Sequence, residues 1–168
     1  MEGQIQSTRR EMEVANVDST MLQLVEIVQK EVDTFQTLLD TMENEQKALV
    51  TQDVTELETA VAAQSELAVN AAALERARNR LVTELSQELG VTATDMTLKR
   101  LIDRIQGPHS QRLGEMRETL IAMHEKILAA NRQNSLLIKQ SMKYVDKSLR
   151  ILTGDCPETG VYAQSGKV

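Results

Sequence analysis

Residues 48–57, ALVTQDVTEL, decide the fold because they end one long helical pattern and begin another. Asp53 stands three residues before Glu56, a spacing typical of a helix start, where the Asp side chain accepts from a free backbone amide. Only Thr51 and Gln52 remain for the connection. A loop this short joins two helices that pack against each other, so the second helix is expected to run antiparallel to the first.

The apolar residues on both sides of this segment recur at steps of three and four, with Gln46 as an interruption. Such a seam is typical of a coiled coil or a long helical bundle. It predicts helices over about residues 19–50 and 54–89, with Gly90 as the residue that ends the second. The seam positions are Met21, Val25, Val28, Val32, Phe35, Leu39, Met42 and Leu49, then Leu57, Ala60, Gln64, Leu67, Ala71, Leu74, Arg78, Leu81 and Leu85.

The rest of the chain predicts one short helix and one long one. The short helix is expected over about residues 95–106, capped by Thr94 or Asp95 and ended by Gly107-Pro108. The long one is expected over about residues 110–153, with Gly154 as its stop. Residues 1–17 are polar and predict a frayed start or an extra helical turn, and residues 154–168 predict a flexible tail. The expected fold is all-α: one coiled-coil-like bundle of long antiparallel helices over residues 1–153, with one short helix and a flexible C-terminal tail.

Charge is distributed unevenly along the chain. The net charge is −6, which argues against nucleic acid as a partner because nucleic-acid binding selects clustered Lys and Arg. Residues 19–50 and 53–90 each sum to −4, whereas residues 107–153 sum to +4. Two acidic helices and one basic helix attract when they lie side by side, although each exposed pair contributes only ~0–1 kcal/mol.

Catalytic and metal-binding patterns are missing from the sequence. Cys156 is the only cysteine, and His109 and His124 are the only histidines, so neither zinc ligands at paired spacing nor a Glu-x-x-His di-iron pattern occurs. With no phosphate-binding loop either, we expect no cofactor, no metal site and no enzyme activity. A phosphotransfer bundle using His124 stays an alternative. We expect a cytoplasmic protein, since no signal peptide or membrane-spanning run stands out.

The last long helix combines a polar pair with an apolar stripe. Asn131 and Asn134 interrupt its seam, and a polar seam residue commonly sets helix register. This helix is expected to be the longest, at about 44 residues, so the other two cannot cover its final third. An uncovered amphipathic end is suited to binding another helix, although plain core packing is the competing interpretation. The candidate binding residues are Asn131, Asn134, Leu137, Ile138, Met142, Val145, Leu149 and Leu152.

Several segments resemble the FlgN-type flagellar export chaperones. They are residues 131–138 (NRQNSLLI), 144–149 (YVDKSL) and 160–166 (GVYAQSG), together with 43–50 (ENEQKALV) and 53–60 (DVTELETA). The similarity is to a layout over about residues 20–166. Its most specific parts are the Asn-x-x-Asn-x-x-Leu segment and the tail that contains Tyr162.

This resemblance implies a cytoplasmic, all-helical chaperone of the flagellar type III export system. Such proteins hold hook-associated proteins of the hook–filament junction, prevent their premature assembly and deliver them to a membrane protein of the export gate, without inserting into the membrane. It also implies that the tail with Tyr162 docks on the gate, separately from the client-binding helix. The main alternative is a structural coiled coil that self-associates through the same apolar face, and a homo-oligomer is possible on either interpretation.

Overall fold

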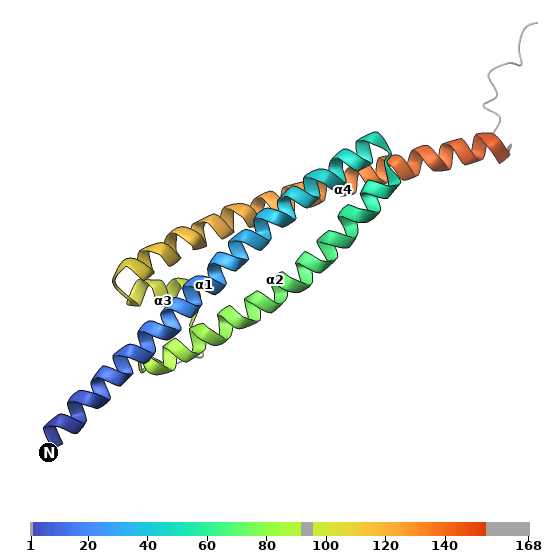
Figure 1. Ribbon diagram of the computed structural model, residues 1–168. Helices are drawn as coiled ribbons and strands as arrows, with labels where there is room; N and C mark the ends of the chain where they lie inside the picture. Colours follow the sequence, from blue (N-terminus) through green and yellow to red (C-terminus); the bar gives the residue numbers. More distant parts are fainter. Residues whose placement is uncertain (1, 92–95, 154–168) are drawn as a thin grey trace, which may run out of the picture.

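The computed structural model describes residues 2–91 and 96–153, with side chains from Asn16 onward. Within these ranges the chain forms only helices, and no strand is present. The four helices are α1 (Glu2–Thr51), α2 (Val54–Glu88), α3 (Leu98–Arg104) and α4 (Pro108–Thr153), and the three long ones pack lengthwise (Figure 1). The predicted all-α fold is confirmed. The predicted flexible tail and Tyr162 lie outside the described residues.

The turn between α1 and α2 forms as its sequence predicts. Gln52 takes the left-handed conformation with φ 58°, and the Asp53 N–H donates to the Ala48 carbonyl at 3.0 Å, which closes the end of α1. The Asp53 side chain then accepts from the Glu56 backbone amide at 3.0 Å and begins α2. One residue therefore ends the first helix and starts the second, so α1 and α2 form a tight antiparallel hairpin.

The ends of the other helices differ from the expectations by a few residues. Gly90 ends α2 as predicted, with φ 67°, and the next N–H, of Val91, donates to the Ser86 carbonyl at 2.8 Å. The cap of α3 is Thr97, which accepts from the Arg100 amide, and Thr94 and Asp95 lie outside the described residues. Pro108 is the first residue of α4, because proline lacks the N–H that a helix start leaves without an internal partner.

The first helix is longer than the sequence predicts. α1 begins at Glu2 rather than near Ser19, so it has 50 residues and α4 has 46. The expectation that the last helix is the longest is therefore wrong. The additional turns of α1 extend beyond the end of α2 and the start of α4, away from the hairpin turn (Figure 1). They consequently leave the far end of α4 without any further cover.

Helix α1 is the central element of the bundle. α2 packs antiparallel to it and α4 packs parallel to it, whereas the backbones of α2 and α4 do not pack against each other (Figure 1). The short α3 contacts both α2 and α4 near the start of α4. The fourth side of a regular bundle is thus missing between α2 and α4, and each of these helices has one flank without a neighbour.

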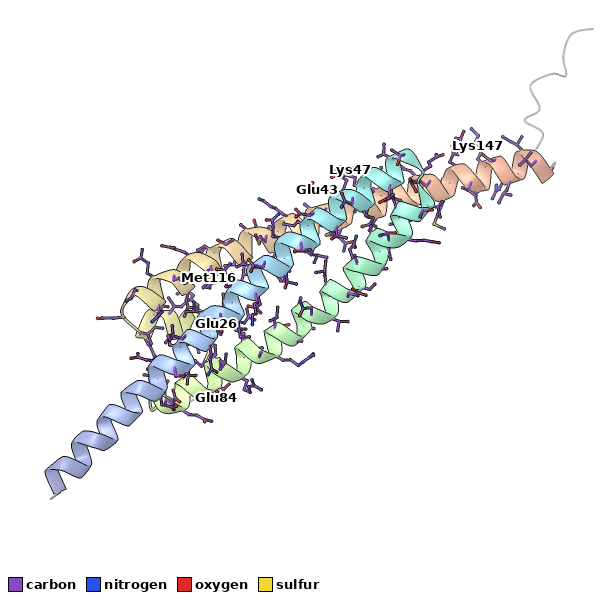
Figure 2. All side chains as sticks on the ribbon, in the orientation of Figure 1. Glu26, Glu43, Lys47, Glu84, Met116 and Lys147 are labelled. Carbon is purple, nitrogen blue, oxygen red and sulfur yellow. The ribbon has the colours of Figure 1, made fainter. Side chains whose placement is uncertain are left out.

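The hydrophobic core lies at the end of the bundle that α3 covers. Leu24, Leu85, Leu101 and Leu113 have no exposed surface there, and each comes from a different helix. Each such side chain stabilises the fold by about 1.5–3 kcal/mol relative to an exposed one. Met116 of α4 belongs to this cluster (Figure 2). The other end, around the hairpin turn, is packed far less completely.

Candidate docking groove at the end of α4

A buried polar contact fixes the register of α4 relative to α1. The Asn134 side chain is 2% exposed, and its amide donates to the Met42 carbonyl at 3.0 Å and to the Glu45 carboxylate at 2.8 Å. Gln64 of α2 donates to the same carboxylate oxygen at 2.7 Å. Three helices therefore meet at Glu45. This geometry supports the register interpretation of Asn134 that the sequence left open.

This register leaves the end of α4 projecting beyond the hairpin. Beyond Met42, α1 has nine residues left before it ends at Thr51, whereas α4 has nineteen residues beyond Asn134 before Thr153. About ten residues of α4 thus extend past the turn, or ~15 Å at 1.5 Å per residue. Figure 1 shows this projection, and Figure 2 shows Lys147 on it. The projection follows from the register of α4, not from its total length.

A groove lies in the corner between the projecting helix and the hairpin turn. It consists of two adjoining hollows of about 560 and 410 Å³ that share Leu49, Leu57, Ser141 and Val145. One wall comes from the end of α1 and the start of α2, and the other from α4. Most lining side chains are apolar, so the groove can bury an apolar stripe of a partner helix. The remaining lining residues are Glu45, Ala48, Gln52, Asp53, Val54, Val61, Ile138, Met142, Tyr144, Asp146, Ser148, Leu149 and Leu152.

The structure separates the predicted binding residues into several groups. Five of them line the groove, namely Ile138, Met142, Val145, Leu149 and Leu152. Leu137 is half-buried and lines neither hollow. Asn131 is exposed beside a separate, shallow hollow on α4 with Leu136 and Lys139. Asn134 is inaccessible behind Glu45, so a client can reach it only if the three helices separate.

The sequence did not predict that the hairpin between α1 and α2 forms one wall of the groove. Leu49 and Leu57 are seam residues, and seam position alone predicts core packing rather than a ligand-facing surface. Val54 is 65% exposed at the first position of α2, outside the heptad seam. A valine immediately after a cap is the one local sign that this turn carries an apolar surface. Tyr144 of α4 also lines the groove beside Val145.

The described residues contain neither a metal centre nor a membrane helix. Within 2–91 and 96–153, no group of three His, Cys, Asp or Glu side chains is placed to hold a metal ion. Over the same ranges, every helix is too short or too polar to cross a bilayer. His124 is exposed beside Glu125 in the N-terminal half of α4, whereas the groove is lined by the C-terminal half of this helix.

A sequence model of the family described as FlgN protein matches residues 21–168. The chain belongs to the FlgN family. FlgN proteins are flagellar export chaperones, and the match includes the hairpin, α3, all of α4 and thus every residue of the groove. No curated protein and no solved structure is similar enough to match this chain.

Proposed function

We propose that this FlgN protein is a cytoplasmic chaperone that holds a hook-associated protein in the groove between α4 and the hairpin turn. The observation that carries the proposal is the projection of α4, whose apolar residues form one wall of an open groove beside the hairpin turn. Val145 is 56% and Leu152 is 82% exposed, and both line the groove. A soluble protein rarely leaves so large an apolar surface uncovered unless another molecule binds to it.

The shape of the groove favours a helical client segment. A helix laid along the projecting part of α4 takes the place that α1 would occupy if it continued past Thr51. Its apolar side chains can then contact Leu149 on one side and Leu57 on the other. Burial in this groove also covers the assembly surface of the client, which prevents premature polymerisation. Met142 in the wall can adjust its rotamer to an irregular partner.

Two neighbouring residues of α4 test this site. Leu149 lines the groove, whereas Ile151 is 59% exposed and does not. Leu149→Asp is expected to weaken binding of purified hook-associated proteins at least about tenfold, and Ile151→Asp is expected to leave it within about twofold, measured by isothermal titration calorimetry. Equal losses in the two variants would contradict the groove as the binding site.

We further propose that Tyr162 docks the loaded chaperone on the cytoplasmic domain of an export-gate protein. The proposal rests on the tail pattern of residues 160–166 and on the FlgN family match, which extends to residue 168. Tyrosine offers a large contact surface and a hydroxyl group at low entropic cost. Tyr162→Ala is expected to weaken binding to the gate domain without changing client affinity. Wild-type gate binding by this variant would remove Tyr162 from the site.

The FlgN family is not known for enzymatic activity, and we infer a binding role alone. Self-association through the same apolar face is the alternative function. Light scattering separates the two, because a structural coiled coil stays oligomeric on dilution and does not take up a client. A chaperone forms a complex with the hook-associated protein that replaces any weak self-association.

A further inference from the structure

The outer face of α4 carries a row of cationic side chains. Arg132, Lys139, Lys143 and Lys147 are all exposed. At about 100° of rotation per residue they lie within an arc of ~80° around the helix and extend over ~22 Å along it. Asn134, which contacts α1, precedes Lys143 by nine residues and thus lies on the opposite side of the helix. The four cations, which we call the basic row, therefore face away from the bundle.

The basic row carries positive charge that no neighbouring acid neutralises. Residues 131–153 sum to +4, with Asp146 as their one carboxylate, although the whole chain carries −6. Among the residues that the structure describes, none forms an ion pair with a member of the basic row. The cations near the core differ in this respect, since Lys99, for example, pairs with Asp103 at 2.7 Å.

The acidic part of the chain lies behind α4. Subtracting the +4 of residues 131–153 from −6 leaves −10 for the rest of the chain. Helix α1 packs on the side of α4 opposite the basic row and separates α4 from α2 (Figure 1). Packed helix axes lie ~8–10 Å apart, and the Debye length is ~8 Å at physiological salt, so the acidic helices are largely screened from the outer face. Lys147 lies on the projection, beyond the hairpin turn (Figure 2).

The shape of the basic row favours a flat anionic surface over a protein partner. Leu136, 61% exposed, is the one apolar side chain within the arc, and it lines a shallow hollow of about 390 Å³ with Arg132 and Lys139. A strip ~22 Å long and ~10 Å wide offers ~200 Å², far below the ~800 Å² that each partner contributes to a stable protein interface. A layer of anionic headgroups needs no such area, because each Lys or Arg near it contributes separately.

We infer that the outer face of α4 binds the anionic surface of a lipid bilayer. The basic row contacts the charged headgroups, and Leu136 and the hydrocarbon stems of the lysines lie at the boundary of the acyl chains. The contact is peripheral and requires no part of α4 to cross the bilayer. It goes beyond the proposed client site and does not depend on it, because Met142 of the groove lies about 100° around the helix from Lys143. A client and a bilayer can therefore bind α4 together.

Sedimentation with sucrose-loaded vesicles tests the inference with the full-length protein. At low salt, vesicles with about 30% phosphatidylglycerol in phosphatidylcholine are expected to bind at least about tenfold more protein than vesicles of phosphatidylcholine alone. Raising the salt to ~0.5 M is expected to remove this preference, because the contact is electrostatic. Equal binding to both vesicles would overturn the inference. Failure to bind either would do so too, and would leave an acidic protein as the partner of the basic row.

Matched variants test the location. Lys143→Gln with Lys147→Gln is expected to lower binding to the phosphatidylglycerol vesicles at least about tenfold. Lys30 and Lys126 are exposed outside the basic row, so Lys30→Gln with Lys126→Gln changes the net charge equally and is expected to stay within about twofold of the wild type. Equal losses in the two double variants would reduce the binding to net charge and overturn the proposed face.

Two leucines test the apolar contact in the same assay. Leu136→Asp places a carboxylate inside the basic row and is expected to lower vesicle binding at least about tenfold. Leu22 of α1 is 51% exposed, and Leu22→Asp adds the same charge away from the row, with little effect expected. Vesicle binding by Leu136→Asp equal to that of Leu22→Asp would contradict the proposed face.

Client binding distinguishes this inference from the proposed function. Neither Lys143 nor Lys147 lines the groove, so their double Gln variant is expected to bind hook-associated protein within about twofold of the wild type. Joint loss of client and vesicle binding would show that the substitutions disturb α4 as a whole, and it would overturn the assignment of the lipid contact to the outer face.

Discussion

Asn134 and Glu45 are 89 residues apart in the sequence, and a 2.8 Å hydrogen bond joins their side chains inside the bundle. Glu45 also accepts from Gln64, so this carboxylate connects α1 with both α2 and α4. The closed core lies on one side of this contact, and the open groove between α4 and the hairpin turn lies on the other. The contact therefore sets where the well-packed part of the bundle ends.

Asn134→Ala is expected to lower the free energy of unfolding by about 1–3 kcal/mol, because the buried Glu45 carboxylate loses a donor. The exposed neighbour Ser135 provides the control, and Ser135→Ala is expected to stay within about 0.5 kcal/mol of the wild type. Urea unfolding followed by circular dichroism measures both. Equal stability of the two variants would show that the contact does not hold the register.

Glu31 predicts a pH dependence of stability. Burial raises the pKa of Glu31 above its usual 4.5, although Arg78 lowers it in part, and Glu75 raises it further. A raised carboxyl pKa favours the folded state below pH 4.5, and this contribution is lost as the pH rises through the folded pKa. Glu31→Gln is therefore expected to gain stability relative to the wild type between about pH 4 and pH 8. Urea titrations of Glu31→Gln and the wild type at both pH values measure the difference in their free energies of unfolding. The exposed Glu66 provides the control variant, Glu66→Gln. A difference for Glu31→Gln that stays constant or falls as the pH rises would contradict the prediction.

Among the residues that the structure describes, Gln52 is the one non-glycine residue with a positive φ, which is 58°. Glycine adopts this conformation without a Cβ clash, so Gln52→Gly is expected to raise the free energy of unfolding by up to about 1 kcal/mol. Thr51→Gly, one residue earlier at the end of α1, is expected to lower it by about 0.5–1 kcal/mol. Thermal melting compares the two. A lower melting temperature for Gln52→Gly than for the wild type would contradict the role of the turn.

Leu24 and Leu152 are expected to respond oppositely to truncation. Leu24 is 0% exposed in the core, so Leu24→Ala is expected to cost about 2–5 kcal/mol of stability. Leu152→Ala removes a side chain that no helix covers, and it is expected to leave the unfolding midpoint unchanged within error while weakening client binding. A large loss of stability in Leu152→Ala would mean that the end of α4 is covered.

Much of the fold follows from short stretches of sequence. The turn at Gln52 and Asp53 and the stop at Gly90 are predictable because a helix end is determined by contacts within about five residues. The apolar stripe of α4 from Ile138 to Leu152 is also visible in the sequence, since its period is that of a helix. The start of α1 is not visible in the sequence, because residues 2–18 lack a clear apolar period although they belong to the helix.

The docking groove depends on contacts between residues far apart in the chain. A heptad seam permits several registers of two helices, and the contacts of Asn134 with Met42 and Glu45 select one of them. That register places the end of α4 beyond Thr51 and makes Val145 and Leu57 line the same hollow from opposite walls. The sequence by itself therefore determined the helices except for the start of α1, together with their hairpin and the apolar stripe, because these depend on local backbone hydrogen bonds and periodicity. Only the tertiary structure decided which part of the stripe stays uncovered and which residues face it, because both depend on the register of α4 along α1.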